Sequence, residues 1–199
     1  MSTTPKLYPI LLAAGPFPHP GLAKPLTLLG GSSAIETAIK NCEGLAKPLV
    51  VLGYRAAVLI RQVPRDAKIV VNENWRAGQL GSLLAGLQHV PLDAAFLLYP
   101  VDHVFLTPGV IRRLVQAYQE RKRGQELFRP RFKERAGHPV IFSANMRFEL
   151  ERAPTARDVV YRDWSRICFV NVRTPAIWRK MESPARTRRH KRDTRRSNS

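Results

Sequence analysis

The segment Tyr8-Pro9-Ile10-Leu11-Leu12-Ala13-Ala14 is an almost continuous apolar run, and runs of the same kind recur along the first half of the chain. The others are Pro48–Gly53, Ala67–Asn72 and Ala94–Tyr99. Strands that are apolar on both faces are typical of a parallel sheet that helices cover on both sides. We therefore expect these segments to be strands of one buried sheet.

Segments with apolar residues at helical spacing lie between and after these strands. Ser32 or Ser33 can cap the first of them, with Glu36 in its first turn. The alternation of strands and helices predicts an α/β domain with a Rossmann-like, doubly wound, mainly parallel sheet and right-handed crossovers. The expected helices are Ser32–Cys42, Arg55–Gln62, Leu80–His89 and Pro108–Arg121.

The pattern loosens after Gly124. Two short strands, Glu126–Phe132 and His138–Phe142, are expected on either side of a turn at Lys133–Gly137, and together they predict a small hairpin insertion. The elements expected after it are a helix at Ser143–Arg152, a helix near Ala156–Arg162, a strand at Arg166–Val172 and a last helix from about Pro175.

The chain has 199 residues, enough for one domain with a substantial core, and we place that domain at residues 1–184. Residues 185–199 carry seven Lys and Arg against one Asp, and we predict a disordered basic tail there. With 33 Lys and Arg against 15 Asp and Glu, the net charge is +18. Such a charge favours anionic partners, namely nucleotide phosphates, acidic metabolites or nucleic acid.

Two cysteines, Cys42 and Cys168, are too few for a disulfide framework or for a zinc site built on cysteine. We expect both thiols to be reduced, as in a cytoplasmic protein. The sequence contains no run of about 18 or more apolar residues, so no membrane-spanning helix is expected.

The loop after the first strand is the first place to expect a ligand, because doubly wound sheets bind ligands beyond the carboxyl ends of their strands. Its small residues Ala13, Ala14 and Gly15 leave the backbone open to close approach by a phosphate or a base edge. Further along, Lys24 offers a compact positive charge for a polyphosphate. Taken alone, the segment is better explained as a proline-rich turn with a solvated lysine.

The segment from Leu12 to Lys24 resembles the signature L-A-A-G-x-S-x-R-M-G-x-x-K of the MobA-like nucleotidyltransferases, which include the enzymes that attach CMP or GMP to molybdopterin. The resemblance covers roughly residues 7–181. It continues in order through Asn74-x-x-x-Gly78-x-x-x-Ser82-Leu83, Gly86-Leu87, Pro100-Val101-Asp102, Gly137-His138-Pro139-Val140 and Asn171-Val172-Arg173-Thr174-Pro175.

This resemblance implies a Mg²⁺-dependent transfer of a nucleoside monophosphate from a nucleoside triphosphate to a phosphorylated acceptor, with release of pyrophosphate. Molybdopterin is the first acceptor implied and a sugar phosphate the second. The reaction needs positioned charges more than covalent chemistry, because the triphosphate must be neutralised and the acceptor aligned in line with it.

Asp102 ends an apolar strand, and a carboxylate at that edge of the sheet suits Mg²⁺; an aspartate that caps a turn is the alternative. The resemblance implies catalytic roles for Lys24 and Asp102 and makes Asn171 a second metal ligand. It places His138 on the acceptor side, where the ring would bind acceptor phosphate or order a hairpin. The nucleotide-binding residues that it implies are Leu12, Ala13, Ala14, Gly15, His19, Gly21, Lys24, Gly78 and Ser82.

The first loop departs from the family signature, since Phe17, His19 and Pro20 replace its Ser, Arg and Met. An Arg would be charged and bidentate towards phosphate, whereas a His is mostly neutral near pH 7. The family's D-I-D-T-P also loses both carboxylates, at Asn171 and Arg173. Two alternatives therefore stay open: a catalytically degenerate nucleotide-binding or regulatory protein of the same fold, and nucleic-acid binding through the basic tail.

Overall fold

The computed structural model describes residues 6–16, 28–29 and 31–180. The basic tail and the loop that contains His19, Gly21 and Lys24 lie outside the described residues. Among the residues described, no helix is long and apolar enough to cross a membrane.

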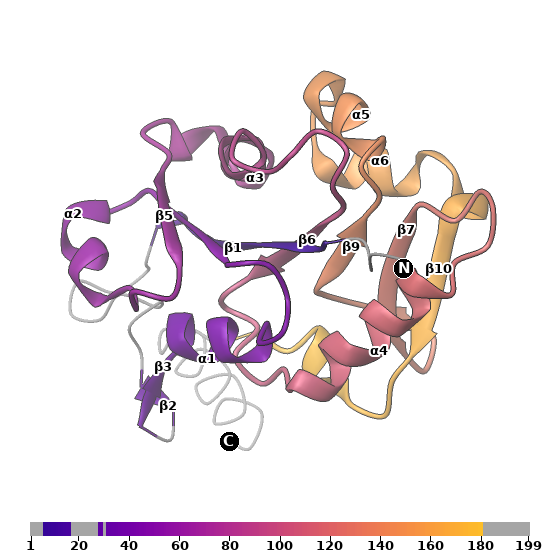
Figure 1. Cartoon of the computed structure of the whole chain (residues 1–199), viewed down its shortest axis with the longest axis horizontal. Helices are drawn as coiled ribbons and strands as arrows, with labels where there is room; N and C mark the ends of the chain where they lie inside the picture. Colours follow the sequence, from indigo (N-terminus) through magenta and orange to yellow (C-terminus); the bar gives the residue numbers. More distant parts are fainter. Residues whose placement is uncertain (1–5, 17–27, 30, 181–199) are drawn as a thin grey trace, which may run out of the picture.

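One mainly parallel sheet with the strand order β10-β7-β9-β6-β1-β4-β5 forms the middle of the molecule (Figure 1). β1 lies between β4 and β6 and runs parallel to both, with Ile10 opposite Leu49 on one side and Leu98 on the other. The strands are β1 (Tyr8–Ala13), β4 (Leu49–Leu52), β5 (Lys68–Val71), β6 (Phe96–Pro100), β7 (Leu127–Phe132), β9 (Val140–Phe142) and β10 (Ile167–Asn171). A short β8 (Arg135–Ala136) pairs with β7, and β2 (Leu28–Leu29) pairs with β3 (Ser32–Ser33) apart from the main sheet.

Helices cover both faces of the sheet, and each face has its own apolar core. In Figure 1, α3, α5 and α6 lie above the sheet while α1 and α4 lie below it. The strands are buried on both sides because each side packs against a helical layer. The helices are α1 (Ala34–Asn41), α2 (Ala56–Leu59), α3 (Gln79–Leu87), α4 (Pro108–Gln119), α5 (Met146–Arg152) and α6 (Ala156–Arg162).

Local sequence accounts for where the helices begin. Ser33 caps α1 in a capping box, because its side chain accepts from the Glu36 N–H while Glu36 bonds back to the Ser33 N–H. Pro108 occupies the first turn of α4, where no N–H is required. Helix α3 lies so close to β1 that a Cβ at Gly86 would come within 2.6 Å of Ile10 Cγ2. This close approach packs the last turn of α3 directly against β1.

The predicted α/β fold with a mainly parallel sheet is confirmed. The expected hairpin, however, is part of the main sheet and not a small insertion beside it. β7 and β9 flank the turn as expected, but both are internal strands of the main sheet. β9 lies between β6 and β7 and runs antiparallel to each of them. The expected last helix is only a single 3₁₀ turn, η5, at Pro175–Ile177.

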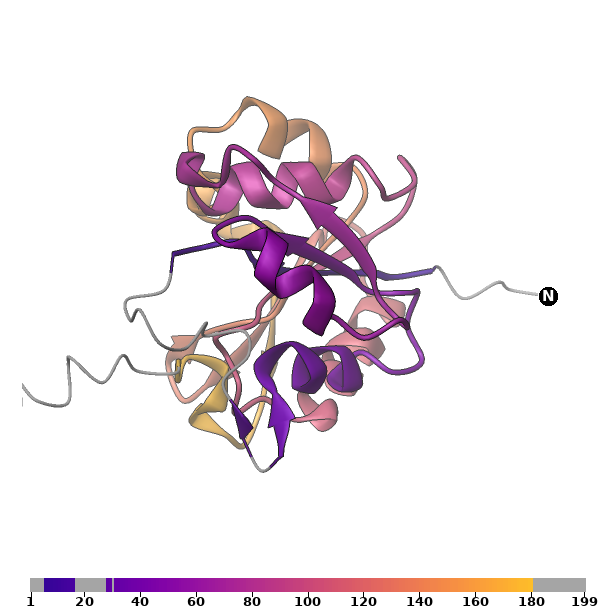
Figure 2. The ribbon, with the colours of Figure 1, turned by 90° about the vertical axis from the view of Figure 1, so that its left-hand side faces the viewer.

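Because the other main strands run parallel, their carboxyl ends meet at one edge of the sheet. In Figure 2, β1 runs from the N-terminal side on the right to this edge on the left, with helical layers above and below it. β9 runs in the opposite direction, so it is the start of β9 that reaches this edge.

Candidate functional site

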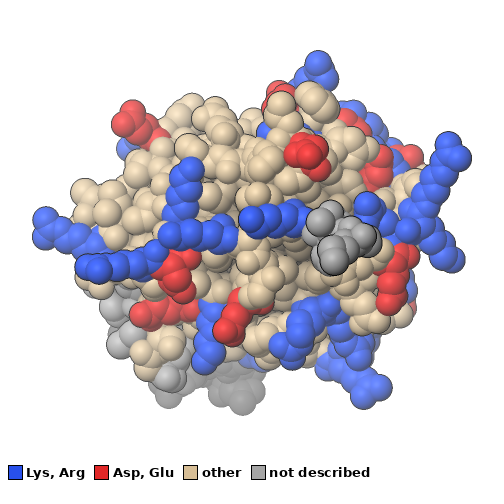
Figure 3. Space-filling model, viewed as in Figure 1, with Lys and Arg blue, Asp and Glu red and all other residues tan. Residues whose placement is uncertain are grey.

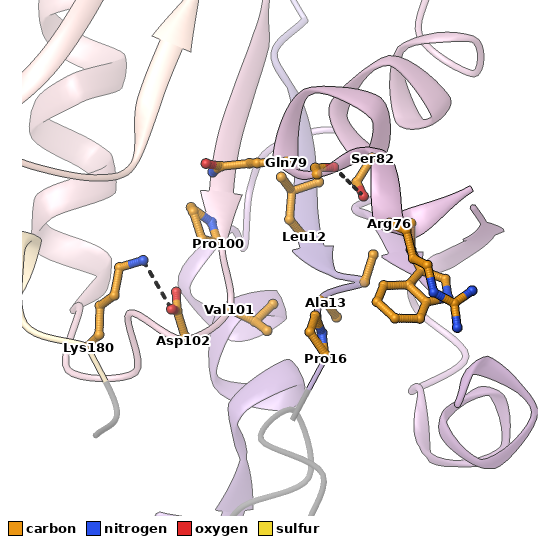
Figure 4. Close-up of a pocket in the computed structure, with 14 residues that line it drawn as sticks. Leu12, Ala13, Pro16, Arg76, Gln79, Ser82, Pro100, Val101, Asp102 and Lys180 are labelled. Atoms are coloured by element: carbon orange, nitrogen blue, oxygen red, sulfur yellow. Dashed lines mark hydrogen bonds and ion pairs between the residues drawn. The ribbon is translucent and has the colours of Figure 1, made fainter. Parts of the chain in front are cut away.

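A cleft of about 570 Å³ opens at the carboxyl ends of β1 and β6, beside the start of α3 (Figure 4). This is the edge at which doubly wound sheets bind ligands. The residues that line it come from four separate segments: Leu12, Ala13, Ala14, Gly15 and Pro16; Trp75, Arg76, Gly78, Gln79 and Ser82; Pro100, Val101 and Asp102; and Lys180.

The floor of the cleft is the end of β1 and the residues that follow it. Ala13 and Ala14 are buried, and nothing lies within 4 Å of where a Cβ on Gly15 would stand. Neighbouring chain segments hold this backbone in place, since the Val101 N–H donates to the Leu12 carbonyl at 3.1 Å. A ligand can therefore approach the main chain here without meeting a bulky side chain.

The wall at the start of α3 carries Ser82. Its buried hydroxyl accepts from the Asn72 side-chain N–H₂ at 3.1 Å and donates to the Gly78 carbonyl at 3.3 Å. Gly78 precedes the helix and provides no side-chain cap, so the first-turn N–H groups of α3 have no partner from a cap. Such a terminus attracts negative charge.

Two wall residues, Trp75 and Arg76, were not among the predicted site residues. The Arg76 guanidinium carbon lies 4.5 Å from the Trp75 ring centroid, and Tyr54 packs edge-on against the same ring at 5.4 Å. Both residues lie inside the motif that begins at Asn74, so the motif contained a signal for them. Besides packing against Tyr54, Trp75 lines the cleft.

Asp102 lies across the cleft from Ser82, just beyond β6 (Figure 4). Its Oδ2 lies 3.2 Å from Nζ of Lys180, whereas its Oδ1 is buried without a hydrogen-bond partner among the described residues. The nearest ring nitrogen, Nε2 of His103, is 3.9 Å from Oδ1, which is too far for a hydrogen bond. Lys180 belongs to none of the motifs, so no sequence signal identified it.

Two histidines stand behind Asp102, with the ring centroids of His103 and His138 5.0 Å apart. Burial lowers the pKa of His103 to about 4, although the Asp102 carboxylate acts in the opposite direction. Burial likewise lowers the pKa of His138 to about 3, and the charge of Arg129 adds to the effect. Both rings are therefore neutral at pH 7. His138 is not among the cleft-lining residues, so its proposed contact with an acceptor stays a prediction.

Asn171 ends β10, and two strands, β9 and β7, separate β10 from β6. At the usual strand spacing this puts roughly 14 Å between the axes of β6 and β10. The Asn171 Oδ1 accepts from Nε of Arg131 at 3.1 Å, and its backbone carbonyl accepts from Arg113 at 3.1 Å. Asn171 does not line the cleft in which Asp102 stands, and its role as a metal ligand also stays a prediction.

A divalent metal ion fits this cleft through Asp102. Within the described ranges, no group of three or more His, Cys, Asp and Glu side chains could hold a metal by itself. Asp102 nevertheless lines the cleft, and its carboxylate has one oxygen, the buried Oδ1, without a hydrogen-bond partner among the described residues. Mg²⁺ is often held by one or two carboxylates, with waters and substrate phosphates completing its shell. The donor set therefore suits a metal that arrives with a phosphate ligand.

The excess of Lys and Arg over Asp and Glu is not confined to the tail. Figure 3 shows basic side chains spread over the face of the molecule seen in Figure 1, with fewer acidic ones between them. That face is the amino edge of the sheet, and the net charge of the whole chain is +18. A field of this sign raises the local concentration of anionic ligands.

Residues 9–168 match the family described as MobA-like NTP transferase domain. No curated protein is similar enough in sequence to match the chain. Among solved structures, Rv0371c from Mycobacterium tuberculosis H37Rv superposes with a TM-score of 0.79 at 20% identity, covering 94% of this chain and 98% of that one.

Two further structures share the fold. A complex of Rv0371c with manganese gives a TM-score of 0.71 at 21% identity, covering 92% of this chain and 97% of that chain. The molybdopterin-guanine dinucleotide biosynthesis protein A of Archaeoglobus fulgidus gives 0.66 at 16% identity, covering 95% of this chain and 99% of that chain. At these identities the likeness establishes the fold alone.

Proposed function

Since the chain belongs to the MobA-like NTP transferase family, we propose that its cleft transfers a nucleoside monophosphate from a nucleoside triphosphate to a phosphorylated acceptor. An oxygen of the acceptor phosphate attacks the α-phosphorus and forms the new P–O bond. The bond from the α-phosphorus to the bridging oxygen breaks, and pyrophosphate leaves with that electron pair.

One observation carries the proposal: the carboxylate of Asp102, with its partnerless Oδ1, faces the small-residue floor of β1 and the uncapped start of α3 across a single cleft. A triphosphate placed between these walls would have backbone N–H groups on one side and a metal-binding oxygen on the other. These are the two demands of the chemistry, because most of the catalysis comes from positioned charge.

Different described residues would bind the nucleotide and the metal. The backbone at Leu12–Gly15 and the Ser82 side of the cleft would hold the nucleotide, and Asp102 would hold Mg²⁺. When bound, Mg²⁺ supplies positive charge that offsets the charge of the phosphates. His19, Gly21 and Lys24 complete the proposed phosphate loop but lie outside the described residues.

On the acceptor side we propose molybdopterin first and a sugar phosphate second. A neighbour in fold is named for molybdopterin-guanine dinucleotide biosynthesis, which supports the first choice. His138 lies two residues before β9 and its ring is 5.0 Å from that of His103, the residue after Asp102, which supports an acceptor position beyond Asp102.

A second candidate is a nucleotide-binding protein without transferase activity. It is favoured by the replacement of the signature Arg by His19 and by the bond that ties the Asn171 side chain to Arg131. Both features remove groups that the family places on the triphosphate or on the metal.

Pyrophosphate release separates the two candidates. Each of the four NTPs is offered with Mg²⁺ and either molybdopterin or a panel of sugar phosphates. A transferase releases pyrophosphate with at least one pair, and Asp102→Asn lowers that rate by about a hundredfold or more. Asp93→Asn makes the same change in charge at an exposed site away from the cleft and leaves the rate unchanged. Nucleotide binding without turnover for every pair would instead establish the second candidate.

A further inference from the structure

Lys180 is the cationic partner of Asp102, and it reaches the cleft from the opposite end of the sheet. It follows η5, which comes after the edge strand β10, whereas Asp102 follows the internal strand β6. In Figure 4 the lysine stands beside Asp102 at one side of the cleft, and its ammonium points at the carboxylate. The contact thus joins two segments that are 78 residues apart, as the residue numbers show.

The chain around Lys180 is anchored, so this placement is built into the fold. The Ile177 carbonyl accepts from the His138 N–H at 2.7 Å. Two cation–π contacts hold the next residues: Arg135 lies over the Trp178 ring at 4.6 Å, and Arg179 lies over the Phe105 ring at 4.9 Å. The backbone before Lys180 is therefore fixed, while its side chain lines one side of the cleft and reaches Asp102.

The ion pair itself is easily broken. The Lys180 side chain is 56% exposed and that of Asp102 is 24% exposed. Exposed pairs of this kind contribute little net stability, because water competes for both partners. The ammonium can therefore leave the carboxylate at low cost when a stronger anion comes within its reach.

A metal ion and this ammonium would repel each other if both were bound to the Asp102 carboxylate. The ammonium nitrogen is 3.2 Å from Oδ2, so a divalent ion on Asp102 would lie a few ångströms from a second positive charge. A triphosphate removes the conflict, because it brings several negative charges into the same cleft and offers the ammonium another partner.

We propose that Lys180 stands in for the metal on Asp102 until nucleotide binds, and then transfers to the triphosphate as the metal takes the carboxylate. This inference rests on the proposed function, because it uses the same cleft and the same metal ligand. The proposal predicts an order of binding: the affinity for a divalent metal is low without nucleotide and higher when the nucleotide binds with it.

The test is Mn²⁺ binding to the full-length protein without nucleotide, followed by the loss of the free-ion electron paramagnetic resonance signal. Lys180→Gln keeps a similar length and removes the charge, so it tightens Mn²⁺ binding by about three- to tenfold. Lys180→Arg keeps the charge and behaves like the wild type. Arg112→Gln removes one charge from an exposed residue of α4 that does not line the cleft, and shifts the affinity by less than about twofold.

A second measurement tests whether the Lys180 ammonium binds phosphate. Inorganic tripolyphosphate, titrated in the presence of a chelator, binds about tenfold more weakly to Lys180→Gln than to the wild type, because one charge-assisted contact is lost. The same variant thus raises the affinity for Mn²⁺ and lowers the affinity for tripolyphosphate. A merely structural role of Lys180 would not produce these opposite shifts.

The proposal is overturned if Lys180→Gln leaves Mn²⁺ affinity unchanged or lowers it, if Arg112→Gln tightens Mn²⁺ binding as much, or if neither the wild type nor Lys180→Gln binds Mn²⁺. Asp102→Asn separates this failure from failure of the proposed function. If Mn²⁺ binding is lost in Asp102→Asn but unaltered in Lys180→Gln, only the proposed role of Lys180 is contradicted. If Mn²⁺ binding survives in Asp102→Asn, Asp102 is not the metal ligand and the proposed metal site is contradicted.

Discussion

The carbonyl oxygen of Ile177 occupies the space that a side chain at Gly137 would need. The adjacent His138 N–H donates to that same carbonyl at 2.7 Å, so the start of β9 and the turn η5 are joined backbone to backbone. Lys180 lies three residues beyond Ile177. The position of its ammonium over Asp102 therefore depends on a glycine in a different segment.

Gly137→Ala is expected to destabilise the fold by about 1–3 kcal/mol, because the new methyl group must push a backbone carbonyl out of its place. Urea unfolding measures the change. Gly109→Ala is the matched control: a Cβ there meets its nearest neighbour at an ordinary 3.7 Å, and Gly109 lies in the first turn of α4. That variant should be neutral or more stable by up to about 1 kcal/mol. Equal effects of the two substitutions would contradict the packing explanation.

Asn41 holds the turn that follows Asp102. Its buried side-chain N–H₂ donates to the Tyr99 hydroxyl and to the Leu106 carbonyl, each at 3.0 Å. Asn41→Leu leaves both acceptors buried without this donor and should cost about 1–3 kcal/mol in urea unfolding. Tyr99→Phe removes only one of the two bonds and should cost less, about 1 kcal/mol. A larger loss for Tyr99→Phe would show that the Leu106 contact contributes little.

Ser82 and Asn72 form a buried pair beneath the start of α3. Ser82→Ala leaves the Asn72 side-chain N–H₂ without its acceptor, so we expect a loss of about 1–2 kcal/mol. Asn72→Ala should cost a similar amount. The double variant should lose less than the sum of the two, by about 1 kcal/mol, because the second substitution removes no further bond. Additive losses measured by urea unfolding would mean that the hydrogen bond does not couple the two residues.

Stability should fall in acid because of His138. The groups that face it are the neighbouring His103 and the charges of Arg129 and Lys180, and all of them act with burial to lower its pKa to about 3. The unfolded chain takes up its proton near pH 6.5, whereas the folded chain does so only near pH 3. The stabilisation from His138 is thus fully present above about pH 6.5, and roughly 3 kcal/mol of it is lost between pH 7 and pH 4.

Urea unfolding at pH 7, 5.5 and 4 measures this slope. His138→Gln should make the slope shallower without abolishing it, because burial also lowers the pKa of His103 to about 4; His89→Gln, which removes an exposed histidine, should leave the slope unchanged. A wild-type slope that survives in His138→Gln would assign the acid sensitivity to other groups.

The parallel core of the fold was predictable because each buried strand is an apolar run whose neighbours along the chain are helical. The place of β9 was not. A three-residue strand, Val140–Phe142, carries no local sign that it pairs between β6 and β7 rather than beside them. Strand order depends on long-range packing, and the apolar pattern of a strand is the same at either position.

The same distinction applies to the cleft. Leu12–Gly15, Gly78, Ser82 and Asp102 all line it, because parallel strands bring their carboxyl ends to one edge. Their functional roles stay predictions. Lys180 could not be found from the sequence, since a lysine after Trp178 and Arg179 has no periodicity or motif. Its contact with Asp102 exists only because η5 folds back against the start of β9.

The reversed direction of β9 also determines where this protein could diversify. Its parallel neighbours end at the cleft edge, whereas β9 begins there, so the connection from Phe132 to Gly137 arrives beside Asp102 from the opposite direction. Lys133 and Glu134 at its tip are exposed and lie outside the pairs between β7 and β8. Extra residues inserted between these two would lengthen the loop before His138 and leave the pairs in place, because exposed loop tips tolerate insertion. Under the proposed function, selectivity for the acceptor could thus evolve independently of the nucleotide site.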